Sequence, residues 1–136
     1  MNLLLLQPEN MLNTHLAEIS GRQVQHIHNT LNLEQGGTLS VGLLNNKMGR
    51  ATLLELNKNN AKLDIEWTSS PPASLPLTLI IGLPRPKMLK RIIQTATTMG
   101  VKELYFIHSW KVEKSYWQTP VLSNEQIERY LLEGLS

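Results

Sequence analysis

An apolar run, a helix-spaced segment and a second apolar run follow one another closely, and this pattern constrains the fold of the chain most. Residues 77–81 are almost entirely apolar and the run ends at Gly82, which predicts a strand buried on both faces. Apolar residues then recur at helical spacing over 86–99, and Gly100 stands where a helix normally stops. A second apolar run follows at 104–107. Strand, helix and strand in so short a span predict a right-handed βαβ unit with parallel strands.

The turn after the first of these strands, residues 82–87, lies at the edge of the sheet where ligands of open α/β folds collect. Its glycine spacing fits neither a Walker loop nor a dinucleotide-binding fingerprint. Arg85 and Lys87 flank the start of the predicted helix, where free backbone N–H groups and the helix dipole favour anions. The turn is therefore a candidate phosphate site, and a rigid turn with exposed charges is the equally weighted alternative.

The first 70 residues predict a small, mostly β domain. Apolar and β-branched residues gather in four segments separated by turn formers. The predicted strands are 3–6, 39–44, 50–56 and 61–67. The sequence Ser20-Gly21-Arg22-Gln23 has the form of a capping box, and the apolar spacing after it predicts one short helix. We expect the last three of these strands to form a meander that closes as a small barrel.

A Pro- and Ser-rich segment, residues 69–74, is the clearest linker, because its composition resists both helix and central strand. We therefore expect a domain at 1–70, a linker at 71–76 and a second domain at 77–136. A second Ser-x-x-Gln motif, which begins at Ser123, predicts a C-terminal helix. Two strands and two helices leave apolar strand faces and an edge uncovered, so the second domain looks incomplete.

Positive charge is concentrated around the βαβ unit, although the net charge of the chain is only +2. From Arg85 to Lys114 there are seven Lys and Arg residues and two Asp and Glu residues. From Met1 to Ala73 there are five Lys and Arg residues and six Asp and Glu residues. Such a patch suits a phosphate-bearing partner, and the alternative is a solvated helix face. The chain has no cysteine, no signal-peptide pattern and no stretch of transmembrane length. We therefore expect a cytoplasmic protein without a membrane partner.

The histidines predict neither a metal site nor a hydrolase. His26 and His28 point in different directions on a helix, and no third ligand stands at a convincing spacing. His28 falls within the apolar stripe and is expected to be packed, whereas His26 is placed to meet a phosphate. His108 ends the second strand of the βαβ unit, and the single aspartate, Asp64, is too distant in sequence to suggest a catalytic triad.

Two lysines lie among three aromatic residues in the segment 110–117. Lys111 and Lys114 beside stacking rings are typical of proteins that bind single-stranded nucleic acid. Tryptophan and tyrosine also anchor hydrophobic cores, so these rings alternatively cover the exposed sheet. For each ring we favour packing over base stacking.

Similarity to a known family is carried by four segments of the chain. They are Ser20-Gly21-Arg22-Gln23-Val24-Gln25-His26-Ile27, Ile92-Ile93-Gln94, Met99-Gly100-Val101-Lys102-Glu103-Leu104 and Val112-Glu113-Lys114-Ser115-Tyr116-Trp117. These segments resemble the bacterial methyltransferases that methylate N3 of a uridine in 16S rRNA. The resemblance implies an α+β protein, in which a small PUA-like β-barrel that binds RNA precedes the first part of an α/β, SPOUT-like methyltransferase domain.

The chain departs from this family at several positions. The family's S-adenosylmethionine site lies in a C-terminal trefoil knot with a Gly-Pro-Glu-Gly-Gly loop, and this loop does not occur here. The resemblance therefore implies S-adenosylmethionine for the full-length family member, whereas we expect this chain alone to bind no cofactor and to be inactive. Smaller departures are Leu31-Asn32, where the family often has a leucine and a basic residue, and Thr95 and Thr98, where many members carry Lys and Glu.

The resemblance implies that the partner is 16S rRNA or the small ribosomal subunit. Catalytic residues are not assigned, and we expect RNA contacts from eight basic residues: Arg22, His26, Lys47, Arg50, Arg85, Lys87, Lys111 and Lys114. The family also forms a homodimer through its methyltransferase domain, and the absence of the knot puts this dimer in question. Two alternatives stay open, which are a non-catalytic rRNA-binding protein and a degenerate product without the cofactor site.

Overall fold

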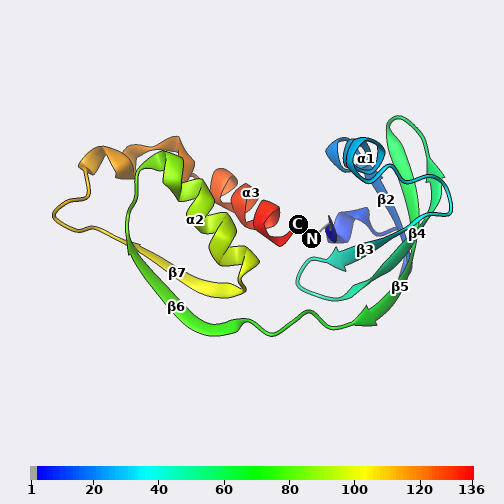
Figure 1. Ribbon diagram of the computed structural model, residues 1–136, viewed down its shortest axis with the longest axis horizontal. Coiled ribbons are helices and arrows are strands. Elements are labelled where there is room, and N and C mark those ends of the chain that lie inside the picture. The colour runs from blue at the N-terminus through cyan, green and yellow to red at the C-terminus, as the bar shows by residue number, and fades with distance from the viewer. Residues whose placement is uncertain (1–2) are drawn as a thin grey trace. The chain divides into compact units, whose positions relative to one another are not determined.

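The structure, a computed structural model, describes residues 3–136 and has a mixed α+β architecture. The chain divides into two compact units, Met1–Pro71 and Pro72–Ser136. Figure 1 shows that strands dominate the first unit, whereas helices lie against two strands in the second. Across the described residues, every helix is too short or too polar to cross a membrane.

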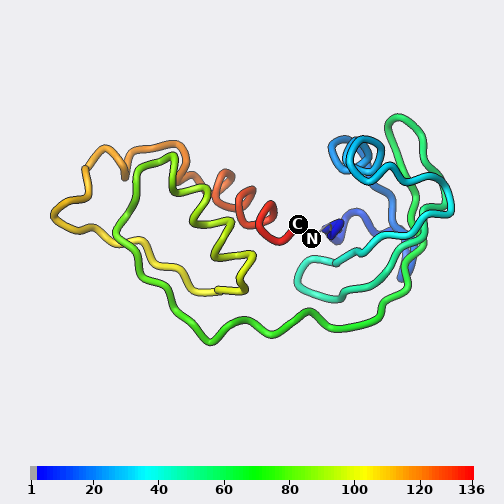
Figure 2. Tube along the Cα trace, in the orientation of Figure 1, coloured from blue at the N-terminus to red at the C-terminus, as the bar shows by residue number. Residues whose placement is uncertain are grey.

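The first unit is built on a curled five-stranded sheet (Figure 2). Its strands are β1 (Leu3–Leu6), β2 (Leu16–Ser20), β3 (Thr38–Leu43), β4 (Met48–Leu56) and β5 (Asn60–Ser69). They lie in the order β1-β3-β4-β5-β2, with β1 parallel to β3 and the other neighbours antiparallel. The four strands predicted from the sequence are confirmed, and β2 was missed. Because β1 and β2 are the two ends of this order, closure into a barrel stays a prediction.

Buried and exposed side chains alternate along the strands of the first unit, and the buried ones form its core. On β5, Ala61, Leu63 and Ile65 are buried while the residues between them are exposed. The helix α1 (Arg22–His26) adds Val24, and Ile27 follows it into the same cluster. Both side chains are fully buried, so the helix covers the apolar side of the curled sheet.

The predicted capping box at Ser20 is wrong. Ser20 is the last residue of β2, and Gly21 becomes the N-cap with a φ of 62°, a conformation in which glycine avoids the usual steric cost. The side chain of Gln23 turns away from the helix start, and its Nε2 donates a hydrogen bond to the carbonyl oxygen of Leu5 at 2.6 Å. The Ser-x-x-Gln pattern therefore joins α1 to β1 instead of capping the helix.

The predicted packing of His28 is also wrong. The helix continues beyond α1 as the π-helical segment η2 (Ile27–Leu31), which ends at Asn32 with a φ of 47°. A π-helical turn holds more residues than an α-helical turn, so the apolar stripe loses its phase there. His28 is exposed, and its Nε2 lies 3.1 Å from the carbonyl oxygen of Asn57.

The second unit contains the predicted βαβ arrangement. The strand β6 (Leu75–Gly82) runs parallel to β7 (Val101–Ile107), and α2 (Pro86–Thr98) connects them. Gly100 has a φ of 82°, which ends the helix at the predicted glycine. Two short 3₁₀ segments follow, η3 (Lys114–Gln118) and η4 (Pro120–Leu122), and then α3 (Asn124–Leu135). Ser123 caps α3 as predicted, since its hydroxyl accepts a hydrogen bond from the Gln126 amide at 3.4 Å.

Only one face of the β6–β7 pair is covered, so the prediction of a strand buried on both faces is wrong. Leu104 and Phe106 pack against Leu89 and Ile93 of α2. On the opposite face, the large side chains of β6 and β7 remain exposed: Ile80, Tyr105 and Ile107. The prediction that two strands and two helices leave apolar strand surface uncovered is confirmed.

The helices α2 and α3 pack closely through Gly134. A Cβ atom at Gly134 would lie 2.8 Å from the carbonyl oxygen of Gln94 and 2.9 Å from Thr97 Cβ. The carbonyl oxygen of Gly134 also accepts a hydrogen bond from Thr98 Oγ1 at 2.8 Å. Gly134 therefore allows the two helices to approach closely, and any larger side chain at this position would push them apart.

A charged group on α3 adds a polar tie between the same helices. Glu133 accepts hydrogen bonds from Gln94 at 2.6 Å and from Arg129 at 3.0 Å, and Lys90 Nζ lies 3.2 Å away. Burial alone would raise the pKa of Glu133, but the hydrogen bonds from Arg129 and Lys90 outweigh it, so this pKa lies below its ordinary value. The carboxylate is therefore held in its charged form.

Replacement of this carboxylate is expected to weaken the second unit. Glu133→Gln should lower its free energy of unfolding by about 1–2 kcal/mol at neutral pH, because charge-assisted hydrogen bonds are lost from partly exposed partners. A lowered folded-state pKa contributes stability above the unfolded-state pKa of about 4.3, and the contribution disappears as the pH falls through the folded-state value. Urea unfolding at neutral and acidic pH checks both points. A difference between the variant and the parent that does not shrink in acid would contradict the assignment.

Candidate nucleic-acid interface

The carboxyl ends of β6 and β7 form one edge of the second unit. The amide of Leu83 donates a hydrogen bond to the carbonyl oxygen of Ile107 at 2.9 Å, so the two strand ends are held side by side. Arg85 is the N-cap of α2, and Pro86 occupies the first helical position, where its fixed φ suits the helix. The first turn of α2 therefore starts at the same edge at which β7 ends.

The segment after β7 crosses this edge in a fixed turn. The amide of Val112 donates to the carbonyl oxygen of Ser109 at 2.9 Å, and Val112 packs onto the apolar cluster of the second unit. A Cβ atom on Gly82 would lie 3.6 Å from Ser109 Oγ and 3.7 Å from Val112 Cγ2. The turn after β7 thus passes over the last residue of β6.

Four of the eight predicted RNA contacts lie in the two segments at this edge: Arg85, Lys87, Lys111 and Lys114. All four are exposed. Glu113 is the acidic residue of these segments, whereas Glu103 lies nearer the amino end of β7 and accepts a hydrogen bond from Thr78 Oγ1 at 2.7 Å. The edge therefore carries an excess of positive charge next to the start of a helix, and both features attract anions. We call these four residues the cationic edge.

The aromatic residues of the segment 110–117 behave differently from one another. Tyr116 packs onto the apolar cluster, as predicted. Trp117 is 40% exposed, and its Nε1 donates a hydrogen bond to His108 Nδ1 at 3.2 Å. Trp110 is 90% exposed, with Lys111 Nζ 5.6 Å from its ring centroid. The predicted packing is therefore wrong for Trp110. His108 also lies at this edge, a position for which its sequence context gave no signal.

The other four predicted contacts lie in the first unit in two groups. Arg22 and His26 are one helical turn apart on α1 and both are exposed. Lys47 lies in the turn between β3 and β4, with its Nζ 5.8 Å from the ring centroid of Trp67. Arg50 follows on β4, where its Nη2 donates to Thr38 Oγ1 at 3.1 Å. Lys47 and Arg50 thus contact neighbouring side chains of their own sheet, whereas Arg22 and His26 on α1 extend into solvent.

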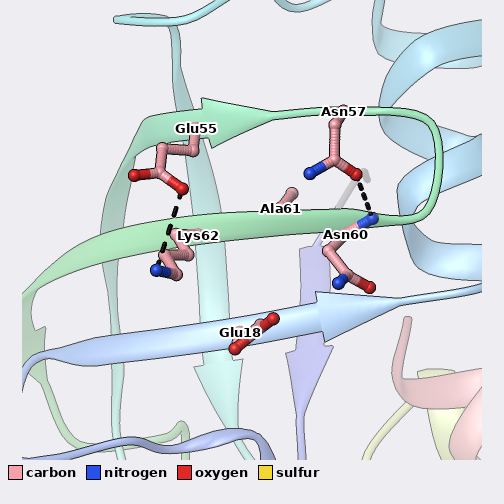
Figure 3. A pocket seen from close by; sticks show the side chains of 6 residues that line it. All are labelled: Glu18, Glu55, Asn57, Asn60, Ala61 and Lys62. Atoms are coloured by element: carbon pink, nitrogen blue, oxygen red, sulfur yellow. Dashed lines mark hydrogen bonds and ion pairs between the residues drawn. The ribbon is translucent and has the colours of Figure 1, made fainter.

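A polar pocket of about 210 Å³ lies where β2, β4 and β5 run side by side (Figure 3). Its lining residues are Glu18, Glu55, Asn57, Asn60, Ala61 and Lys62. Lys62 Nζ lies 3.7 Å from Glu55 Oε2, so the ammonium group that lines this pocket is already paired with a carboxylate. With a second carboxylate from Glu18, the pocket disfavours phosphate, and none of the eight predicted contacts lines it.

Residues 71–136 match a family model described as the RNA methyltransferase domain. The chain is also 28% identical over 138 residues to a ribosomal RNA small subunit methyltransferase E of Treponema pallidum, and the match covers 99% of this chain. A shorter match, 33% identical over 58 residues, joins 43% of this chain to 24% of a ribosomal RNA small subunit methyltransferase E 1 of Borreliella burgdorferi. The chain spans 52% of the length of the Treponema relative.

Solved structures share the fold. A ribosomal RNA small subunit methyltransferase E of Neisseria gonorrhoeae bound to S-adenosyl methionine superposes with a TM-score of 0.68. The sequence identity is 20%, and the match covers 96% of this chain and 52% of the Neisseria chain. The fold of this chain therefore recurs within a longer protein.

Proposed function

Residues 71–136 belong to the family of RNA methyltransferase domains, and from this premise we propose that the chain holds rRNA for a methyl-transfer reaction. In this proposal S-adenosylmethionine donates a methyl group to N3 of a uridine in 16S rRNA, in the cytoplasm. The name of the Treponema relative supports small-subunit rRNA as the substrate, and the bound ligand of the Neisseria structure supports the methyl donor. The choice of uridine N3 rests on the resemblance of the four sequence segments.

The reaction places clear demands on the RNA. A bond between N3 and the methyl carbon forms as the bond from this carbon to sulfur breaks, which releases S-adenosylhomocysteine, and the N3 proton passes to a general base. The base must therefore be held in line with the donor, which is a positioning task. We propose that the 136 residues perform this holding role and do not bind the donor or transfer methyl groups by themselves. The Gly-Pro-Glu-Gly-Gly loop that the family resemblance implies for the donor site does not occur in these residues, which supports this division of roles.

The observation that carries the proposal is the cationic edge. Its four basic side chains lie in the two segments that follow parallel strands, which is where open α/β sheets bind ligands. A phosphate at the start of α2 would meet the positive end of the helix dipole together with Arg85 and Lys87, since Pro86 has no N–H group and the Met88 amide already donates to the Arg85 carbonyl oxygen at 2.8 Å. Such contacts hold an RNA backbone without reading its sequence.

We further propose that the first unit is a PUA-like RNA-binding domain, with contacts from Arg22, His26, Lys47 and Arg50. The exposure of all four side chains on helix and hairpin supports this role. Two separate basic regions would suit folded rRNA, which is recognised by shape and backbone as well as by its single-stranded parts. The family resemblance implies a homodimer for the full-length member, and we propose no dimer for these residues.

The test is the pair Arg85→Ala/Lys87→Ala in the full chain. Binding to a 16S rRNA transcript should weaken at least about ten-fold, because two phosphate contacts are lost. The slope of log K against log salt should become shallower by roughly 1.4, at about 0.7 for each single-strand contact. Filter binding or fluorescence anisotropy at several salt concentrations measures both quantities.

The matched control is Lys58→Ala/Lys102→Ala, which removes the same charge from exposed positions away from the cationic edge. This control should bind nearly as tightly as the parent protein. Equal losses in both variants would mean that only net charge matters. An unchanged affinity and salt slope in Arg85→Ala/Lys87→Ala would remove these residues from the RNA interface.

A further inference from the structure

Trp110 is the least expected side chain of the second unit. Tryptophan carries a large apolar surface and is well buried on average, yet 90% of this residue is exposed. The neighbouring rings show the ordinary alternatives, because Tyr116 packs onto the core and Trp117 rests near His108 with ring centroids 6.5 Å apart. Within residues 3–136, Trp110 makes neither kind of contact with a ring or a core residue, so its exposure needs a separate explanation.

The exposure is a consequence of how the turn is anchored. On one side, the carbonyl oxygen of Ile107 is bound by the Leu83 amide, and on the other side Val112 is fixed in the apolar cluster. A hydrogen bond from the Val112 amide to Ser109 closes the turn between these anchors. The loop after β7 therefore extends past the strand ends (Figure 1), and Trp110 lies within it.

The surroundings of the ring indicate a charged and flat ligand. Lys111 Nζ lies 5.6 Å from the ring centroid of Trp110, and Arg85 and Lys87 start α2 at the same edge. An apolar protein surface would gain little from these cations. A nucleotide matches both features, since its base stacks on an aromatic face while its phosphates meet cations.

We propose that Trp110 is a base-stacking residue for an unpaired nucleotide of the bound RNA, with the cationic edge holding the adjacent phosphates. This inference rests on the proposed function and deepens it by naming a single-stranded segment as the ligand of this edge. Paired bases already stack on one another in a duplex and do not offer a face to the ring. Trp110 should therefore distinguish single-stranded from double-stranded RNA.

The experiment compares the parent protein with Trp110→Ala and Trp110→Phe, using an oligouridylate of about ten nucleotides and a duplex RNA of equal length. Trp110→Ala should weaken oligouridylate binding about ten-fold, the effect of removing one base–aromatic stack, and leave the salt slope unchanged. Trp110→Phe should keep most of the affinity because a flat ring remains. Duplex binding should be the same in all three proteins.

Fluorescence gives a second and independent readout. Oligouridylate should quench the tryptophan emission of the parent protein, and the part of this quenching due to Trp110 should be missing from Trp110→Phe. Unchanged oligouridylate affinity in Trp110→Ala, or an equal loss for duplex RNA, would overturn the stacking role. If the parent protein bound neither the oligonucleotide nor a 16S rRNA transcript, the proposed function itself would fail, and this outcome is distinct from the first.

Discussion

Gly49→Ala is expected to lower the free energy of unfolding of the Met1–Pro71 unit by about 3 kcal/mol. A Cβ atom at Gly49 would overlap the backbone carbonyl oxygen of Glu66 and stand 3.0 Å from Trp67 Cα. Both contacts involve the backbone of the neighbouring strand, so no side-chain rotation relieves them. The register of β4 and β5 already shifts between Met48 and Gly49, and separating the strands there would cost hydrogen bonds between them.

Hydrogen exchange followed by mass spectrometry tests this expectation for each unit separately. Peptides from β4 and β5 should lose protection in Gly49→Ala, while peptides from α2 and β7 should keep theirs. The matched control is Gly42→Ala on β3, where the nearest atom to a new Cβ is Leu3 Cδ2 at 3.3 Å. A leucine methyl group moves easily, so this control should cost less than about 1 kcal/mol. Equal protection in both variants would contradict the proposed backbone clash.

The βαβ unit could be predicted from sequence because its determinants are local. The helix begins near Pro86 and ends before Gly100, and both boundaries depend on residues within one turn of them. The parallel pairing of β6 with β7 follows from the short helical connection and the handedness rule. The prediction that these strands are buried on both faces was wrong. Burial depends on which elements cover each face, and the local sequence pattern does not contain this information.

The strand β2 was missed for the opposite reason. It has only two buried side chains, Ala17 and Ile19, and it pairs with β5, which lies 40 or more residues later in the chain. The missed strand also explains why the capping box at Ser20 was wrongly predicted. Ser20 ends β2, so it does not serve as the N-cap of α1. The turn-forming Gly21 was the local signal for a chain reversal at this point.

The basic residues of the candidate site could be predicted from the sequence, whereas the exposure of its aromatic residues could not. The cationic edge follows from the rule that segments after parallel strands meet at one edge. The exposure of Trp110 did not follow, because the sequence places three rings within eight residues and does not reveal which of them reach the core. The fixed position of Val112 decides this, since it anchors one end of the turn and leaves Trp110 outside.

Leu89→Ala is expected to have an effect of similar size on the second unit. Leu89 of α2 is fully buried, and only Leu83 and Ile93 accompany it as buried members of its apolar cluster. Truncation of a buried leucine costs about 2–5 kcal/mol through lost transfer energy and the cavity left behind. A unit this small has little stability to spare, so we expect much of it to unfold at room temperature.

The consequences for RNA binding make this variant informative. Leu89 touches no RNA in the proposal, yet unfolding of the second unit would scatter the cationic edge and remove the stacking position of Trp110. Binding of oligouridylate should therefore be lost, while 16S rRNA binding should retain the part contributed by the first unit. Met88→Ala is the matched control, because Met88 is the preceding residue of α2 and is 41% exposed. Full oligouridylate binding by Leu89→Ala, with the second unit unprotected in hydrogen exchange, would show that the RNA-binding surface lies in the first unit alone.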